Sequence, residues 1–172
     1  MESSASILIK FSTCDGQEVS AEKKLVMRAS TVASMIDDNF DPDDVIPLPE
    51  ITHKTFVKVL DFLKHVDLGN APPTIEKPLR SNDMRDVTTE FYAEYINVPT
   101  DDEVQDIILA ANYLDIKELL ALGCAKMGSI IRGLTIPEFR KRFNIVNDFS
   151  PEEEAEPFDE SKLAELAEAY EK

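Results

Sequence analysis

The alternation of apolar and polar positions first predicts a β-hairpin. Residues 6–11 hold a run of β-branched and aromatic side chains, which is typical of a strand. Residues 14–16 read Cys-Asp-Gly and supply a turn, after which residues 18–20 can return as a second strand. The chain is therefore expected to begin with two short antiparallel strands.

The spacing changes to that of a helix after the hairpin. Apolar side chains recur at helical spacing over residues 22–38, with a break near residues 29–30. Residues 46–49 read Ile-Pro-Leu-Pro, and their prolines exclude a helix and favour a short edge strand. Thr52 can then cap a helix. Its apolar face is formed by Phe56, Val59, Leu60 and Leu63.

The second half of the chain carries helical patterns only. Thr100 and Glu103 form a capping-box pattern. The apolar series that follows consists of Val104, Ile107, Ile108, Ala111 and Leu114. A further helix is predicted from about residue 115 to residue 132, and Gly133 can end it. Shorter helices are expected after the capping residues Thr135, Ser150 and Asp159. Strands mixed with helices, then helices alone, predict an α+β fold with a small sheet.

Residues 68–89 interrupt this periodic pattern. They contain a glycine, three prolines and mixed charges, and show almost no apolar periodicity, so we predict a mobile loop. The predicted organisation is a first domain over residues 1–132, with this loop inside it, and a helical extension over residues 133–172.

Charge and composition narrow the classes of partner. Lys and Arg number 18 against 34 Asp and Glu, which gives a net charge of −16. Such a surface repels phosphate backbones, so no nucleic-acid partner is expected, and the charge keeps the protein soluble. The longest apolar run, residues 119–125, is too short for a bilayer, and the N-terminus lacks a signal peptide. Cys14 and Cys124 are expected to be reduced thiols of a protein located in the cytoplasm and the nucleus.

The sequence offers no constellation for catalysis, a cofactor or a metal. His53 and His65 lack partner residues at the spacing of a zinc site. Motifs for phosphate binding, nucleophilic catalysis and metalloproteases are absent from the sequence. Acidic pairs such as Asp37-Asp38 are more typical of a solvated face than of an acid and base. We therefore expect no enzyme activity, no cofactor and no metal.

Two regions are candidates for binding partners. On a helical wheel of residues 100–114, Leu109 and Tyr113 fall opposite the apolar series, where they contact either a second layer or a partner. After Gly133 the short elements carry four large apolar side chains: Phe139, Phe143, Ile145 and Phe149. Elements this short cannot bury these groups among themselves, so the groups fold back on the main domain or cover a partner.

The last residues contain one narrow apolar stripe. It consists of Leu163, Leu166, Ala167 and Tyr170, spaced as on one face of a helix. Phe158 and Leu163 occupy the positions of a hydrophobic staple around a cap at Asp159. Either this helix orders against a partner or the segment is a disordered acidic end.

Several segments resemble the S-phase kinase-associated protein 1 family. Residues 108–117, which read ILAANYLDIK, are similar to the central signature of that family. Residues 46–49 and segments within residues 140–154 are similar to further family motifs, in the same order. The resemblance implies a BTB/POZ fold with added C-terminal helices. It also implies the role of an adaptor in SCF-type ubiquitin ligases, with a cullin and F-box proteins as partners.

The resemblance also implies site residues. The face that carries Asn112 and Tyr113 would meet the cullin, with Leu109 on the same side of its helix. The last helices would hold the F-box through Phe139, Phe143, Ile145, Phe149, Leu163, Leu166 and Tyr170.

The chain departs from the family pattern at three places. Tyr92-Ala93 stands where the family has a tryptophan and an aspartate, and the proline after Gly133 is displaced by one residue to Pro137. The end of the chain is longer and different. These departures bear on the choice of F-box partners more than on the fold.

Two other functions are open to this sequence. One is a self-associating BTB scaffold or an elongin-C-like adaptor. The extension after Gly133 argues against it, since those relatives end earlier. The other is an unrecognised hydrolase that uses acidic pairs, although no set of nucleophile, base and orienting group can be proposed. Weak homodimerisation of the free chain is a further expectation.

Overall fold

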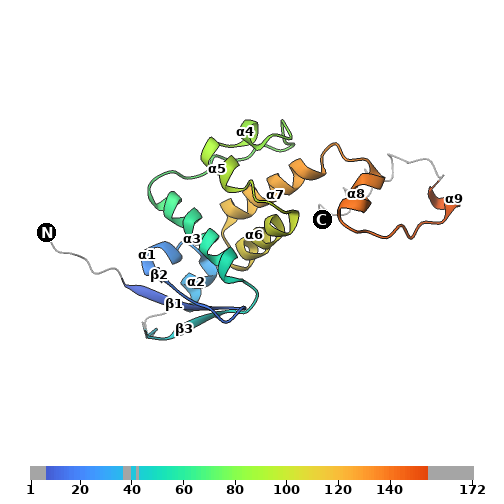
Figure 1. Cartoon of the computed structure of the whole chain (residues 1–172). Coiled ribbons are helices and arrows are strands. Elements are labelled where there is room, and N and C mark those ends of the chain that lie inside the picture. Colours follow the sequence, from blue (N-terminus) through green and yellow to red (C-terminus); the bar gives the residue numbers. More distant parts are fainter. Residues whose placement is uncertain (1–6, 37–39, 42, 155–172) are drawn as a thin grey trace, which may run out of the picture. The chain divides into compact units, whose positions relative to one another are not determined.

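The structure is a computed structural model that describes residues 7–36, 40–41 and 43–154. The chain divides into two compact units, Met1–Gly133 and Leu134–Lys172; Figure 1 shows their elements coloured along the sequence.

A mixed three-stranded sheet opens the first unit. Its strands are β1 (Leu8–Thr13), β2 (Glu18–Glu22) and β3 (Val45–Leu48). β1 lies in the middle, antiparallel to β2 and parallel to β3. Gly16 has a φ of 74° in the turn of the hairpin, a conformation that favours glycine. The predicted hairpin is confirmed, and so is the edge strand, where Pro47 faces no further strand in the described sheet.

Two helices lie between β2 and β3 in the chain, and a third follows β3. They are α1 (Lys23–Val26), α2 (Ser30–Met35) and α3 (His53–Asp67). The predicted break near residues 29–30 separates α1 from α2 and is confirmed. The Thr52 hydroxyl accepts a hydrogen bond from the Thr55 amide at 3.3 Å, so the predicted cap of α3 is also confirmed.

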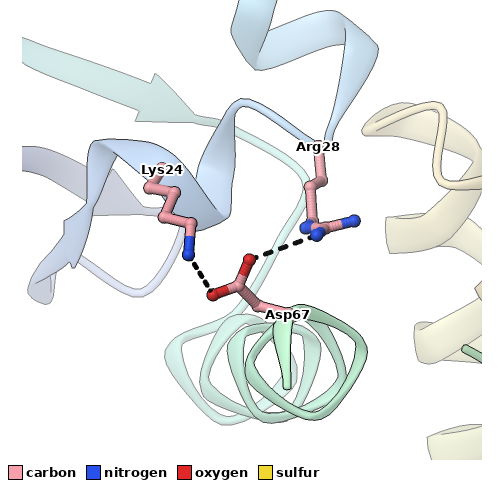
Figure 2. Close-up of polar contacts among 3 residues, drawn as sticks. All are labelled: Lys24, Arg28 and Asp67. Carbon is pink, nitrogen blue, oxygen red and sulfur yellow. Dashed lines mark hydrogen bonds and ion pairs between the residues drawn. The ribbon is translucent and has the colours of Figure 1, made fainter. Parts of the chain in front are cut away.

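A cluster of charged groups joins α1 to the end of α3 (Figure 2). The carboxylate of Asp67 accepts from Lys24 Nζ at 2.8 Å and from Arg28 Nη2 at 3.1 Å. Asp67 is the last residue of α3, where a carboxylate meets the negative end of the helix dipole. The two cations offset that repulsion. Lys24 links α1 to α3, and Arg28 links the residues that follow α1 to α3.

The segment 68–89 contains more regular structure than its sequence indicates. It includes the short helix α4 (Met84–Val87), and both Met84 and Val87 are buried in the core. Two partly buried side chains of the segment, Ile75 and Leu79, also pack against the core. Each pair is at helical spacing, but the two pairs are five residues apart and do not form one continuous apolar series, so the pattern does not predict a long element here. The mobility of the segment stays a prediction.

The helix α5 (Glu90–Tyr95) was not predicted from the sequence. Tyr92 is its buried anchor, with 1% of its surface exposed and its ring centroid 5.6 Å from that of Phe62. Its hydroxyl donates a hydrogen bond to the carbonyl of Asn70. Tyr92 therefore fills a core position and ties residue 70 to α5.

Two long helices complete the first unit, α6 (Asp101–Tyr113) and α7 (Lys117–Ile131), and they pack against each other. The Thr100 hydroxyl accepts from the Glu103 amide at 3.2 Å, as the sequence predicts. Ile108 is only half-buried, whereas Ala110 is buried, so the buried stripe of α6 is shifted around the helix relative to the expected series. α7 approaches α6 closely at Ile108, because a Cβ on Gly123 would lie 2.6 Å from Ile108 Cγ1, so only glycine fits there.

The second unit consists of short elements. The described helices are α8 (Ile136–Arg142) and α9 (Pro151–Glu154). Thr135 and Glu138 form a complete capping box at the start of α8. The same reciprocal bonds join Ser150 and Glu153 at α9. The helix starts predicted at Thr135 and Ser150 are thus confirmed, and Gly133 before them has a φ of 88°.

Candidate functional site

The first candidate surface is the outer face of α6. Leu109 and Asn112 are one helical turn apart and both are exposed, Leu109 to 56%. The opposite face of the helix carries Val104 and Ile107, which are buried. Leu109 therefore presents an apolar side chain to solvent beside an amide that can both donate and accept hydrogen bonds.

Tyr113 is more constrained than the helical wheel suggests. It was expected opposite the core, but its side chain is half-buried and packs against the core cluster. Its carbonyl accepts a hydrogen bond from the Thr31 hydroxyl at 2.7 Å, which ties the end of α6 to α2. The wheel describes one helix and cannot include this neighbour. Tyr113 thus combines a structural contact with a partly exposed side chain.

The turn after α6 fixes the orientation of this face. Asp115 has a φ of 51°, and its amide donates to the carbonyl of Asn112 at 3.2 Å. The Ile116 amide donates to the carbonyl of Ala111 at 2.9 Å. These two bonds form a Schellman motif with an aspartate at the left-handed position, where glycine is usual. The motif ends α6 at Tyr113 and starts α7 four residues later.

The second candidate surface lies in the second unit. Phe139 and Phe143 are half-buried and form a ring pair with centroids 4.8 Å apart. Phe149 is 56% exposed, and the guanidinium carbon of Arg140 lies 5.3 Å from its ring centroid. No residue of α8 is buried. The unit thus holds its aromatic side chains together without enclosing them.

This surface includes apolar residues that sequence reasoning missed. Ile145 was predicted to bind a partner and is 46% exposed. Ile136 is 69% exposed and Val146 is 81% exposed. Neither was singled out, although the same signal, a large apolar side chain on a short charged element, was available for both. Several large apolar side chains exposed within one short unit are typical of a protein-binding surface.

Short polar contacts keep these elements in shape. Hydrogen bonds from the Thr135 backbone and side chain hold the pKa of Glu138 below its usual range. The corresponding bonds from Ser150 lower the pKa of Glu153. Asn144 has a φ of 52°, and the Ile145 amide donates a hydrogen bond to the carbonyl of Arg140 at 2.8 Å.

The remaining residues predicted to bind the F-box, Leu163, Leu166 and Tyr170, lie outside the described residues.

The described residues show no centre for metal chemistry. No group of three or more His, Cys, Asp or Glu side chains that could hold a metal ion occurs among them. His65 stacks on Phe91, with ring centroids 3.4 Å apart. Cys14 and Cys124 are free and exposed.

Among the described helices, none has both the length and the apolar character needed to cross a membrane.

The first unit, a small sheet with helices packed on it, is an α+β fold of the BTB/POZ type, and a short helical unit follows it. The chain belongs to the Skp1 family. A family model described as the Skp1 family tetramerisation domain matches residues 7–67, and one described as the Skp1 family dimerisation domain matches residues 117–164. The resemblance found in the sequence and the predicted fold class are confirmed.

Individual relatives are similar along nearly the whole chain. An S-phase kinase-associated protein 1 homolog from Tetrahymena thermophila is 37% identical, over 92% of this chain and 95% of its own length. The E3 ubiquitin ligase complex SCF subunit sconC from Arthroderma otae is 36% identical, over 96% and 99%. The SCF ubiquitin ligase complex protein SKP1a from Dictyostelium discoideum is 37% identical, over 92% and 96%.

Proposed function

We propose that this chain is an adaptor subunit of an SCF-type E3 ubiquitin ligase, which bridges a cullin to F-box proteins. One observation carries the proposal: proteins named as SCF subunits align with 92% or more of this chain and of themselves. Such alignment includes both candidate surfaces. The alternative of a BTB scaffold or an elongin-C-like adaptor is not favoured, because these relatives extend through the second unit.

The cullin would bind the outer face of α6, through Leu109, Asn112 and Tyr113. The exposure of Leu109 and Asn112 supports this assignment, since an apolar anchor beside a polar group is what a protein interface requires. The half-buried side chain of Tyr113 packs against the core. This packing restricts its rotamers, so less side-chain conformational entropy is lost when a partner covers it.

F-box proteins would bind the second unit, through Phe139, Phe143, Ile145 and Phe149. The tail residues Leu163, Leu166 and Tyr170 are proposed to extend this surface. The support is the exposed apolar set on α8 and the segment after it, which the second unit does not bury by itself.

The chain would act without chemistry of its own. By binding two partners at once, an adaptor raises the effective concentration of a substrate near the conjugating enzyme. This mechanism requires geometry and affinity but no nucleophile, base or cofactor. The location of the chain in the cytoplasm and the nucleus stays a prediction. Weak self-association of the free chain is also still a prediction.

Reconstitution tests the proposal. The full chain, a cullin N-terminal domain and an F-box protein should elute as one ternary complex in size-exclusion chromatography with light scattering. Without the chain, the cullin and the F-box protein should elute separately. A chain that forms only homodimers and binds neither partner would favour the scaffold alternative instead.

A further inference from the structure

A shallow cleft lies between the helices α3 and α5 of the first unit. Each helix contributes side chains spaced three or four residues apart, so one face of each helix lines the cleft. The lining residues are Asp61, Lys64 and His65 from α3 and Phe91, Glu94 and Tyr95 from α5. Leu68, the residue directly after α3, also lines it, and its volume is about 450 Å³. We term it the α3–α5 cleft.

Three aromatic rings of this cleft are held in fixed positions. The His65 and Phe91 rings are stacked, with centroids 3.4 Å apart and planes 12° apart. The Tyr95 ring follows, with its centroid 6.2 Å from that of Phe91 and its plane at 23°. Its hydroxyl donates a hydrogen bond to the carbonyl of Lys58 at 2.8 Å, which ties α5 to α3. The rings are therefore positioned before any partner binds.

The apolar surface of the cleft is open to a partner. Phe91 is 41% exposed and Leu68 is 78% exposed. Exposed apolar side chains are ordinary when they are scattered singly, but here they share one concave site with the other rings. A planar or apolar group of a partner would remove this surface from water.

The charged groups of the cleft are mainly carboxylates. Asp61 stands on α3 and Glu94 on α5, so each helix contributes one. Glu94 forms no ion pair within the part of the chain that the structure describes. Lys64 pairs with Asp61 at 3.3 Å, but both side chains are 59% exposed, so the pair is weak and an incoming cation can replace Lys64. The cleft therefore complements a cation.

The rings narrow the kind of cation. Lys58 Nζ already lies 4.8 Å from the centroid of the Tyr95 ring, so this aromatic group accepts a cation within the fold. Among the described residues no cation lies over Phe91. The guanidinium of arginine is planar, stacks on aromatic faces and presents several donors to carboxylates, whereas the ammonium of lysine is a compact, strongly hydrated charge. Arginine thus fits the rings and the carboxylates together.

We propose that the α3–α5 cleft binds an arginine side chain in an extended basic segment of a partner protein. The guanidinium would stack on Phe91 and pair with Asp61 and Glu94, and an apolar residue of the segment would cover Leu68. The net charge of −16 would attract such a segment. The inference goes beyond the proposed function, because the residues of the cleft are not among those proposed for the cullin or the F-box.

The two histidines of the sequence provide a site-specific probe. His65 lines the cleft, whereas His53 is the first residue of α3 and does not line it. Proton NMR of the full chain at constant pH follows the Cε1 proton of each ring, and the variant His65→Gln assigns the two resonances. The titrant is the peptide acetyl-Gly-Arg-Leu-Arg-Gly-amide. One control peptide replaces its arginines by citrulline, which keeps the shape and removes the charge, and a second replaces them by lysine.

The arginine peptide should shift the His65 resonance in a saturable manner and leave that of His53 in place. The citrulline peptide should bind at least tenfold more weakly, which corresponds to about 1.4 kcal/mol. The lysine peptide should also bind more weakly than the arginine peptide, because its ammonium groups stack less well on the rings.

A pair of charge-removing substitutions tests the carboxylates. Asp61→Asn with Glu94→Gln should weaken binding of the arginine peptide at least tenfold. The matched control is Asp44→Asn with Glu50→Gln, which removes two exposed carboxylates outside the cleft and changes the net charge equally. It should keep the affinity of wild type. Phe91→Leu removes the ring but keeps an apolar side chain, and it should also weaken binding. Melting curves verify that each variant is folded.

Three results would overturn the proposal. Equal shifts at both histidines would show that the acidic surface attracts the peptide without a defined site. Equal affinity for the arginine peptide and either control peptide would remove the assignment to arginine. A His65 resonance that moves with the concentration of the chain alone, or with added cullin or F-box protein but not with the peptide, would mean that a second copy or one of those partners covers the cleft instead.

Discussion

At the scale of single residues, Asp67 stabilises the fold through its cationic partners although its position at the helix end is unfavourable. A carboxylate at the end of α3 is disfavoured by the helix dipole, yet hydrogen bonds from Lys24 and Arg28 and their charges lower its pKa. The folded-state pKa thus lies below the unfolded value of about 3.9. The resulting stabilisation is present above that value and is lost as the pH falls below it.

Asp67→Asn should therefore destabilise the protein at pH 7, and its disadvantage should shrink as the pH falls below about 4. Urea unfolding midpoints of wild type and variant at several pH values measure this. Asp61→Asn is the control, because Asp61 forms only a short-range pair with Lys64 whose side chains are both 59% exposed. A gap between Asp67→Asn and wild type that stays constant with pH would contradict the role given to the cluster.

Asp115 is a second residue whose conformation carries a consequence. With a φ of 51° it occupies the left-handed region, which aspartate and asparagine tolerate and β-branched residues do not. Asp115→Val should destabilise the protein by about 1–2 kcal/mol. Asp115→Asn should change the free energy of unfolding little. Chemical denaturation measures both, and equal stability of the two variants would show that the turn relaxes.

At the scale of elements, the outer face of α6 can be separated from its core face. Leu109→Ala with Asn112→Ala should weaken cullin binding by about 2 kcal/mol or more, if these residues are anchors of the interface. The melting temperature should change little, since both side chains are exposed. Calorimetry measures the affinity, and Ile131→Ala, on the exposed side of α7, is the control.

Tyr113 requires a separate variant in that experiment. Because its ring packs against the core, Tyr113→Ala would lower stability as well as affinity, whereas Tyr113→Phe keeps the packing. A double variant of Leu109 and Asn112 that binds the cullin as well as wild type does would remove α6 from the interface.

The second unit supports a parallel prediction. Ile145→Glu with Phe149→Glu should weaken F-box binding at least tenfold, or about 1.4 kcal/mol, because both residues are exposed apolar groups of the proposed surface. Cullin binding should not change. Leu8→Glu with Val45→Glu, at 51% and 41% exposure in the first unit, is the matched apolar-to-acidic control. Equal affinity of the variant pair and the control for an F-box protein would argue against this surface.

The elements that the sequence predicted share a local cause. Thr52, Thr100 and Thr135 each cap a helix through a bond to an amide three residues on, and such bonds depend on adjacent sequence alone. The burial of Met84 and Tyr92 depends instead on contacts with distant segments. Local spacing does not report such long-range contacts. Phe91, Tyr92 and Tyr95 do recur at helical spacing, so a local signal for α5 was present in the sequence and was overlooked.

At the scale of the whole molecule, the described hydrophobic core and the proposed F-box surface belong to different parts of the chain. Every residue of the described hydrophobic core, from Ile9 to Ala125, lies in the first unit. The contacts in the described part of the second unit include capping bonds, a ring pair and the contact of Arg140 with Phe149, and no residue of α8 is buried. A unit without an enclosed core gains most from a partner that covers its apolar groups.

Residues 1–133 should consequently fold without the rest of the chain. Because the described core is complete within them, the melting temperature of this fragment should lie within a few degrees of that of the full chain, about the shift expected from less than 1 kcal/mol. The fragment should bind the cullin with the affinity of the full chain and bind no F-box protein. Differential scanning calorimetry and two binding titrations measure these outcomes. Should the fragment unfold far below the full chain, the second unit would contribute to the core, and the proposed division between a stable cullin-binding unit and an F-box-binding extension would be wrong.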